Sequence, residues 1–258
     1  MNAIRHLATC TNNNRRIARF YRTIFGIEEL WNDRQNSPYS FYITDGFINM
    51  NCLLVHPGMK RNPGVGVEHF GFYVDDLDET ARKIVAFKSS IKLEDSPRDG
   101  RYEDKRFHDP EGNRLEIATN PWGTEGIQRN PGIRHIAIHV KDLERLADFY
   151  ESVFALKEVG KTLTKDTDST VIYLSDGVFN LALIKNAPGS RFGIQLFGMQ
   201  VQSIDQIQEN LKTSPPFLYE GEPPVEIIRR PKPGPFQSYY LRDPDGNVVD
   251  LSEEGWPV

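Results

Sequence analysis

The sequence has little of what would tie this chain to a membrane, to nucleic acid or to an oxidising compartment. Only two of its 258 residues are cysteine, too few for a disulfide framework at this length. No apolar run approaches the roughly 20 residues that cross a bilayer, and MNAIRHL enters a strand-like pattern without a signal segment. Positive charge is not in excess either, since the formal net charge is −5 and the pI about 5.7. We therefore expect a cytoplasmic protein with no nucleic-acid or membrane partner.

Matched segments of the sequence indicate that the chain is an internal duplication. IRHLATCTNNNRRIARFY, which contains His6, is matched by IRHIAIHVKDLERLADFY, which contains His135. HDPEGNRLEIA near the end of the first copy is matched by RDPDGNVVDLS near the end of the second. We therefore divide the chain into a first domain at 1–120, a linker at 121–130 and a second domain at 131–258.

Each copy alternates the same kinds of element. After the first strand, Ile17, Phe20, Tyr21 and Ile24 stand at i, i+3, i+4 and i+7, which predicts one apolar stripe on a helix. Strands follow, and then the order of strand, helix and strands begins again. We therefore predict an α+β fold of four βαβββ units, two in each domain.

The strands of the first domain have one face that would make a poor core. A strand sends alternate side chains to opposite faces, and the apolar residues of each strand suit the face that its helix covers. The opposite faces carry metal-binding or polar residues: His6, Asn49, Asn51, His69 and Glu116. Such a set is better suited to a cavity.

At this point the sequence resembles a known family. The opening IRHxA, the helix ending in FY, the strand EHFGFYVDD and the closing DPEGNRLEIA are similar to the pattern of the vicinal oxygen chelate superfamily. That superfamily includes glyoxalase I, extradiol ring-cleaving dioxygenases, fosfomycin-resistance enzymes and bleomycin-binding proteins. The resemblance covers nearly the whole chain. It implies two incomplete, curved β-barrels with helices on the outside and a divalent metal on a concave face.

The resemblance also implies the ligands of that metal. The family takes them from the first strand, from the strand that opens the second unit and from the last strand, which here carry His6, His69 and Glu116. Two imidazoles and one carboxylate suit Fe(II), our first choice, or Mn(II), Ni(II) or Zn(II). Open coordination positions would allow a small organic substrate to chelate through two adjacent oxygens.

The second copy departs from this ligand pattern. His135 is present and Asp250 matches Glu116, but Leu196 stands where the first copy has His69. Since leucine cannot bind a metal, we expect a degenerate second site. Some family members exchange units between modules, so His135 is an alternative first ligand. We favour His6, because ring-cleaving members with two tandem domains build the site within one domain. The resemblance also allows a homodimer.

Three kinds of activity remain open. A ring-cleaving or other dioxygenase fits the ligand set best, although the tyrosine that such enzymes carry ten residues before the last ligand is replaced by Arg106. A glyoxalase-like lyase or isomerase needs a further carboxylate or glutamine, and the strand in question offers only Asn49 and Asn51 as pocket residues. A metal-free binding protein of the bleomycin-resistance kind comes third.

The remaining site candidates are few. We take Tyr73 and Arg106 as the catalytic candidates, although a packing tyrosine and a solvated arginine are the alternatives. Arg106 would hold a carboxylate or phosphonate. His56, in a loop, and His108, before a turn, are placed outside the site. Trp31 and the C-terminal GWPV are candidates to cover an apolar substrate.

Overall fold

The chain folds as four successive βαβββ units. The computed structural model describes residues 2–30, 38–59, 64–96, 103–164, 169–185, 191–214, 221–234 and 236–258. The first unit comprises β1 (Ala3–Thr11), α1 (Asn14–Phe25), β2 (Glu28–Glu29), β3 (Ser40–Thr44) and β4 (Asn49–Leu54). The second comprises β5 (Gly66–Tyr73), α2 (Leu77–Phe87), β6 (Glu94–Asp95), β7 (Lys105–His108) and β8 (Arg114–Ala118).

The second domain repeats this order. Its first unit comprises β9 (Gly132–Val140), α3 (Leu143–Phe154), β10 (Lys157–Thr164), β11 (Ser169–Ser175) and β12 (Asn180–Lys185). Its second comprises β13 (Gly193–Gln200), α4 (Ile204–Thr213), β14 (Ile228–Gly234), β15 (Gln237–Arg242) and β16 (Val248–Ser252). None of the helices in the described ranges is both long and apolar enough to cross a membrane.

The four helices of the described ranges each begin at a capping side chain. Asn13, Asp76, Asp142 and Ser203 each accept a hydrogen bond from the backbone N–H three residues further on. Such a cap satisfies one of the N–H groups that have no partner within the helix. The caps therefore fix where each helix leaves its strand.

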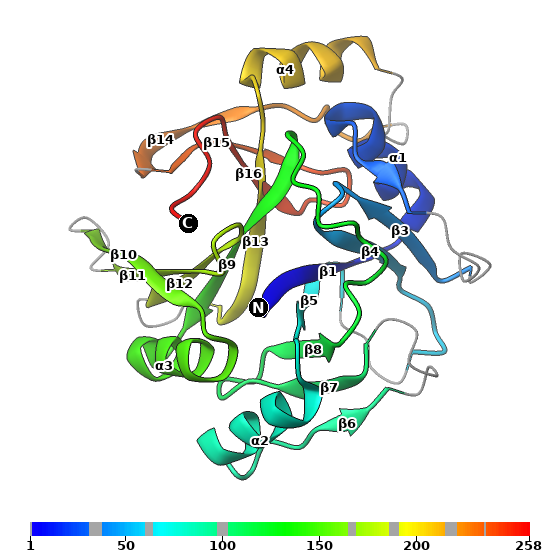
Figure 1. Ribbon diagram of the computed structural model, residues 1–258. Coiled ribbons are helices and arrows are strands. Elements are labelled where there is room, and N and C mark those ends of the chain that lie inside the picture. Colours follow the sequence, from blue (N-terminus) through cyan, green and yellow to red (C-terminus); the bar gives the residue numbers. More distant parts are fainter. Residues whose placement is uncertain are drawn as a thin grey trace.

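Each domain forms one mixed sheet of eight strands (Figure 1). The orders are β2-β3-β4-β1-β5-β8-β7-β6 and β10-β11-β12-β9-β13-β16-β15-β14. The opening strands of the two units lie antiparallel at the centre, and each pairs in parallel with the last strand of its own unit. The predicted α+β fold of four βαβββ units is therefore confirmed. The strands that carry the candidate ligands, β1, β5 and β8, are neighbours.

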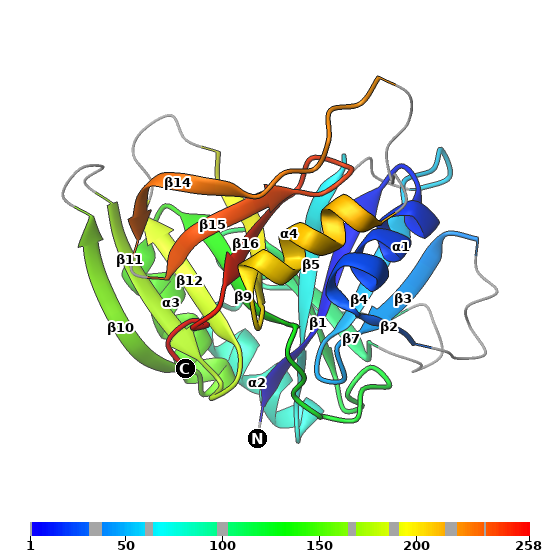
Figure 2. The same ribbon diagram turned by 90° about the horizontal axis from the view of Figure 1, so that it is seen from above.

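The two domains share one hydrophobic core. Figures 1 and 2 show α1 beside α4 and α2 beside α3, and these helix pairs are in contact. Phe72 of β5 stacks on Phe154 of α3 with ring centroids 3.8 Å apart. Tyr21 of α1 lies 5.8 Å from Phe197 of β13, again measured between ring centroids. Each domain therefore completes the core of the other.

Two matching hydrogen bonds cross between the domains. The Tyr21 hydroxyl donates to Asp243 Oδ2 and the Tyr150 hydroxyl donates to Asp109 Oδ2, both at 2.8 Å. Asp109 Oδ1 also accepts backbone N–H groups of its own DPEGN turn, as Asp243 Oδ1 does in DPDGN. The duplicated motifs FY and DPxGN thus meet in reciprocal pairs across the domain interface.

Candidate metal centre

Three neighbouring strands bring His6, His69 and Glu116 together. Their donor atoms form a compact group in which all lie within 4.8 Å of one another. His6 Nε2 is 3.2 Å from His69 Nε2, which is 3.2 Å from Glu116 Oε1. His6 Nε2 and Glu116 Oε2 are 3.8 Å apart. All three residues are at least 96 % buried, so these donors face one another out of contact with bulk solvent.

The orientation of His6 is fixed by a hydrogen-bond chain. The Asn49 side chain donates through Nδ2 to the main-chain oxygen of Trp122 at 3.0 Å, so its Oδ1 must face His6. His6 Nδ1 lies 3.0 Å from Asn49 Oδ1. Because that oxygen can only accept, His6 Nδ1 carries the proton. Its Nε2 is left as a lone pair directed at the other two donors, which is the form in which imidazole binds a metal.

Stacking on an indole ring fixes the plane of the same imidazole. The rings of His6 and Trp122 are nearly parallel, with 5.3 Å between centroids and 4° between planes. The strand position opposite His6 must be glycine, because a Cβ at Gly71 would come within 2.8 Å of the Trp122 ring. The absence of a side chain at Gly71, the glycine of EHFGFYV, therefore leaves room for the Trp122 ring that stacks on His6.

A bulge in β5 aims Glu68 at His69. Ala8 of β1 pairs with His69 and Thr9 pairs with Val67, which leaves Glu68 as an extra residue in the strand. The Glu68 carboxylate contacts His69 Nδ1. His69 is thus held between two carboxylates, that of Glu68 and that of Glu116.

Arg114 joins those two carboxylates. Its Nη1 is 3.0 Å from Glu68 Oε2, and its Nη2 is 2.8 Å from Glu116 Oε1. Burial alone raises the pKa of the Glu116 carboxyl, but the contacts with His69 and His6 and the Arg114 guanidinium outweigh it, so the net shift is downward. Burial lowers the pKa of His69, and lowers that of His6 to about 3. The site therefore holds two neutral imidazoles and an ionised carboxylate at neutral pH.

This donor set fits a divalent cation. Ligand atoms held about 2.1 Å from one ion lie about 3.0–3.4 Å apart at octahedral or tetrahedral angles, and two of the three separations here are 3.2 Å. Glu68 and Glu116 both offer acceptors to His69, which has only one proton to give when neutral. The space among the three residues therefore contains more lone pairs than protons, an imbalance that a bound cation would relieve.

A cavity of about 450 Å³ opens beside the three donors. Asn51 and Arg106, two of the residues selected from sequence, line this cavity. Asn49 does not line it but holds His6. Tyr73 packs in a cluster with Tyr42, Ala118 and Trp122 and is not among the lining residues, so its catalytic role stays a prediction without a contact to the triad. Trp31 lies outside the described residues.

Sequence reasoning missed several residues of this site, among them Trp122 and Glu103, which line the cavity. His56 and His108 line the cavity although both were placed outside it. Glu68 was assigned no role because alternation along a strand turns it away from His69, and Arg114 was assigned none although it shares a strand face with Glu116. The bulge breaks that alternation for Glu68, and no feature of the sequence announces it. For Arg114, the signal was available, since RLE places a cation two residues from the last ligand.

Asn49, the hydrogen-bond partner of His6, has an equivalent in the second domain, Asn180, so its contribution to metal binding can be tested by comparing variants of the two. Asn180 binds His135 Nδ1 at 2.9 Å and the main-chain oxygen of Pro257 at 2.7 Å, as Asn49 does for His6. Loss of such a partner typically weakens metal binding about 10- to 100-fold. We expect that loss for Asn49→Ala and none for Asn180→Ala, measured by competition with a fluorescent chelator. Equal metal affinities of the two variants would contradict the assignment.

The second copy holds no equivalent group of donors among its described residues. His135 stacks on Trp256 with 4.7 Å between centroids, but Leu196, which pairs with Ala137, stands in place of His69, and Asp250 is paired with Arg230. His135 lies outside the group formed by His6, His69 and Glu116, which comes entirely from the first domain.

Burial of His135 should make stability depend on pH. Burial lowers the pKa of His135 to about 3, against about 6.5 in an unfolded chain. Between these values only the unfolded chain binds the proton, so stability is lost as pH falls from 6.5 towards 3. We expect His135→Gln to flatten this dependence by up to about 1.4 kcal/mol per pH unit, measured by urea unfolding of chelator-treated protein.

Comparison with the wild type isolates that effect. Burial raises the pKa of Asp243 to about 6, which acts in the opposite direction because the folded chain then binds the proton more readily. This contribution is common to both proteins and cancels in the difference. Identical pH profiles for the variant and the wild type would show that His135 is not held neutral by burial.

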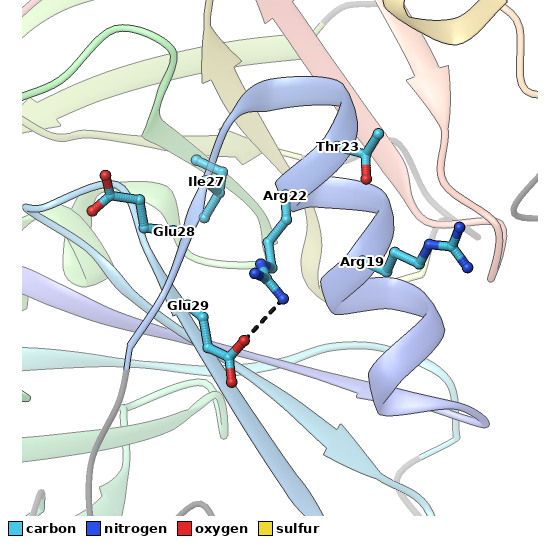
Figure 3. A pocket seen from close by; sticks show the side chains of 6 residues that line it. All are labelled: Arg19, Arg22, Thr23, Ile27, Glu28 and Glu29. Atoms are coloured by element: carbon cyan, nitrogen blue, oxygen red, sulfur yellow. Dashed lines mark ion pairs between the residues drawn. The ribbon is translucent and has the colours of Figure 1, made fainter. Parts of the chain in front are cut away.

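A second hollow lies on the outer surface beside α1 and β2 (Figure 3). Arg22 Nη1 and Glu29 Oε2 form an ion pair at 2.9 Å among its lining residues. None of the described residues that line it belongs to the triad. Its charges are largely exposed, so this hollow offers no set of convergent donors comparable to the metal centre.

Comparisons with known proteins agree with this architecture. A search of curated proteins found no match. Among solved structures, the 2,3-dioxygenase LapB from Pseudomonas sp. KL28 is 17% identical, with a TM-score of 0.71, 99% of this chain covered and 93% of that chain. The Mn(II)-bound glyoxalase from Novosphingobium aromaticivorans is 16% identical, with a TM-score of 0.68, 99% of this chain covered and 83% of that chain.

A third similar structure, a mutant of 4-hydroxymandelate synthase from Streptomyces coelicolor, is 14% identical, with a TM-score of 0.68 and 96% and 91% of the two chains covered. At such low sequence identities the similarity concerns the fold alone, and the three proteins are named after different reactions. The model of the glyoxalase/bleomycin resistance protein/dioxygenase superfamily matches residues 3–117 and again 132–251. The chain belongs to that superfamily, in a form with two tandem halves.

Proposed function

We propose that this protein is a metal-dependent enzyme that chelates two adjacent oxygens of a small organic substrate at His6, His69 and Glu116, and that its reaction is a dioxygenation. The observation that carries the proposal is the buried group of two neutral imidazoles and one carboxylate beside an open cavity. Two histidines and one carboxylate with open positions are the ligand set of non-haem Fe(II) oxygenases. A bound Fe(II) ion supplies Lewis acidity towards the substrate oxygens and the redox capacity that oxygen chemistry needs.

The cavity walls suit a flat molecule. Aromatic rings of Tyr39, Tyr42, Phe107 and Trp122 line it, and flat apolar walls favour aromatic ligands. Arg106 lies directly across the strand pair from Glu116, on the same face of the sheet. It is paired with Glu94 at 3.1 Å and is partly exposed, so its charge could meet an acidic substituent of the substrate.

Several polar groups are placed to handle substrate protons. Asn51 Oδ1 is buried without a hydrogen-bond partner among the described residues and lines the cavity, so it can accept a hydrogen bond from a substrate hydroxyl. His56 and His108 also line the cavity and are the candidates to accept or return a proton. They would serve as the proton-transfer groups in place of the tyrosine that ring-cleaving enzymes carry at the position of Arg106.

One observation favours a glyoxalase-like isomerisation as the second candidate. Glu103 is 91 % buried and lines the same cavity. Ser96 donates a hydrogen bond to Glu103 Oε1 at 2.8 Å, which leaves Oε2 for another partner. A carboxylate in this place could move a proton between neighbouring carbons, which the asparagines of β4 cannot do.

The test combines metal content with two assays. Protein purified without added metal is examined by elemental analysis, then stripped, reloaded with Fe(II) without oxygen and mixed with catechol in an oxygen electrode. The proposal predicts iron and oxygen uptake coupled to catechol loss. The glyoxalase-like function would be established by bound nickel or zinc together with isomerisation of a ketoaldehyde–thiol adduct. That isomerisation should be lost in Glu103→Gln. Absence of metal and of both activities would favour a binding protein.

A further inference from the structure

The sheet face of the second domain that carries His135 repeats the positions that line the triad cavity, with different side chains. The equivalent positions follow from the matched segments ITDGFINMNCLL and LSDGVFNLALI and from the matched closing strands. The paired residues, first domain and then second, are Tyr42 and Tyr173, Asn51 and Ala182, Leu53 and Ile184, Arg106 and Tyr240, and Trp122 and Trp256. Their first members all line the triad cavity.

Of the metal ligands and charged groups of the first centre, the second face keeps only one histidine and one carboxylate. Leu196 replaces His69, Gln195 replaces Glu68 at the equivalent bulge, and Val248 replaces Arg114. The Asp250 carboxylate, fully buried, contacts Arg230 instead. A buried carboxylate requires a cation, and here the chain itself supplies that charge.

Four polar atoms of this face are buried without a hydrogen-bond partner among the described residues, and one of them is Trp256 Nε1. His135 Nδ1 is bound to Asn180 Oδ1, whose amide is fixed by Pro257, so Nε2 is an acceptor. Within the described part of the chain, His135 Nε2, Asp250 Oδ2 and Arg230 Nε have no partner. A buried polar atom without a partner is destabilising, because it has lost its hydrogen bonds to water. With Trp256 Nε1, two acceptors and two donors therefore point to a ligand with complementary polar groups.

The rest of the face is apolar. A separate hydrophobic cluster lies on it: Ala137, Val171, Tyr173 and Ala182, with Val159, Ile184, Leu196 and Phe236 packed against them. The rings of Tyr173 and Phe236 meet edge to face at 5.7 Å between centroids. Trp256, from the C-terminal GWPV segment, lies over His135 at the inner end. Aromatic and aliphatic walls around a few polar atoms are typical of sites for small organic molecules.

We propose that the second domain binds a small phenolic molecule without any metal. Its hydroxyl groups would donate to His135 Nε2 and Asp250 Oδ2, and one phenolic oxygen would accept from Arg230 Nε. The aromatic body would lie against Leu196, Ala182 and the ring of Tyr173. The binding is independent of the proposed enzymatic reaction, because none of its partners belongs to the donor group of His6, His69 and Glu116.

The experiment uses the full chain treated with a chelator and titrated with catechol in a calorimeter. Catechol should bind without metal, and 1,2-dimethoxybenzene, which has the same shape but no hydroxyl donors, should bind at least tenfold more weakly. Ala182→Leu fills the apolar floor and should weaken catechol binding at least tenfold. The matched variant Asn51→Leu, at the equivalent position of the first domain, should leave this metal-independent binding unchanged. Circular dichroism of both variants verifies that they are folded.

The outcomes separate this site from the metal centre. Catechol binding lost in Asn51→Leu but kept in Ala182→Leu would place the ligand in the first domain and overturn the proposal. Equal affinities for catechol and 1,2-dimethoxybenzene in the wild type would overturn the part assigned to His135 and Asp250, even if Ala182→Leu did not fold. Absence of any binding to the stripped wild type would overturn the whole proposal while leaving the enzymatic proposal intact.

Discussion

His69→Leu should abolish divalent metal binding by this chain. His69 Nε2 is the central donor of the group, 3.2 Å from both His6 Nε2 and the Glu116 carboxylate, and leucine has no atom that binds a metal. The loss should exceed the roughly 100-fold that removal of a hydrogen-bond partner of a ligand produces. The measurement is calorimetric titration of chelator-treated protein with Mn(II). Any metal-dependent activity should disappear with the binding.

The duplication provides the controls for this variant. Leucine already occupies the equivalent position of the second sheet, at Leu196, so the same strand geometry accepts it. His135→Leu removes the histidine that stands outside the donor group, and it should leave the Mn(II) affinity unchanged. Loss of binding in His135→Leu, with binding retained in His6→Leu, would instead assign the first ligand to the second domain.

Arg114→Met should destabilise the metal-free protein by about 3–5 kcal/mol, because it leaves two buried carboxylates without their shared cation. Glu68 and Glu116 have side chains only 5% exposed, and Arg114 contacts both. Methionine keeps most of the volume, so the effect is mainly electrostatic. Added Mn(II) should restore more stability to the variant than to the wild type, since the ion supplies the missing positive charge. Urea unfolding with and without Mn(II) measures both quantities.

Arg106→Met is the matched control for the loss of an arginine. Arg106 pairs with Glu94 at the rim, where the two side chains are 34% and 63% exposed. Exposed pairs of this kind contribute about 0–1 kcal/mol, so the change in stability should be small with or without metal. If Arg114→Met cost no more than Arg106→Met, the network that joins Glu68, Arg114 and Glu116 would have no structural role.

The fold could be predicted because its signals are repeated and periodic. The stripe Ile17, Phe20, Tyr21 and Ile24 forms the buried face of α1, and the strand faces of His6 and His69 converge as alternation predicts. The four-unit order follows from motifs that occur twice. Such signals depend on local periodicity, which a single sequence displays directly.

The parts that could not be predicted depend on departures from periodicity and on loops. Glu68 reaches His69 Nδ1 only because β5 contains an extra residue at that point, and a bulge leaves no pattern in a lone sequence. His56 reaches the cavity through its stack on Tyr39, with 3.9 Å between ring centroids, a contact made by a loop. The cation beside Asp250 comes from Arg230, on a different strand of the sheet. Long-range partners of this kind are set by tertiary structure.

Anomalous diffraction from crystals grown with Mn(II) would locate every bound ion in the chain at once. A lone strong peak in bonding contact with Nε2 of both first-domain imidazoles and the carboxylate of β8, with none near Asp250, is the result that we predict. An empty first domain, or a peak bound by other side chains, would contradict the assignment of the metal centre on which the proposed chemistry depends.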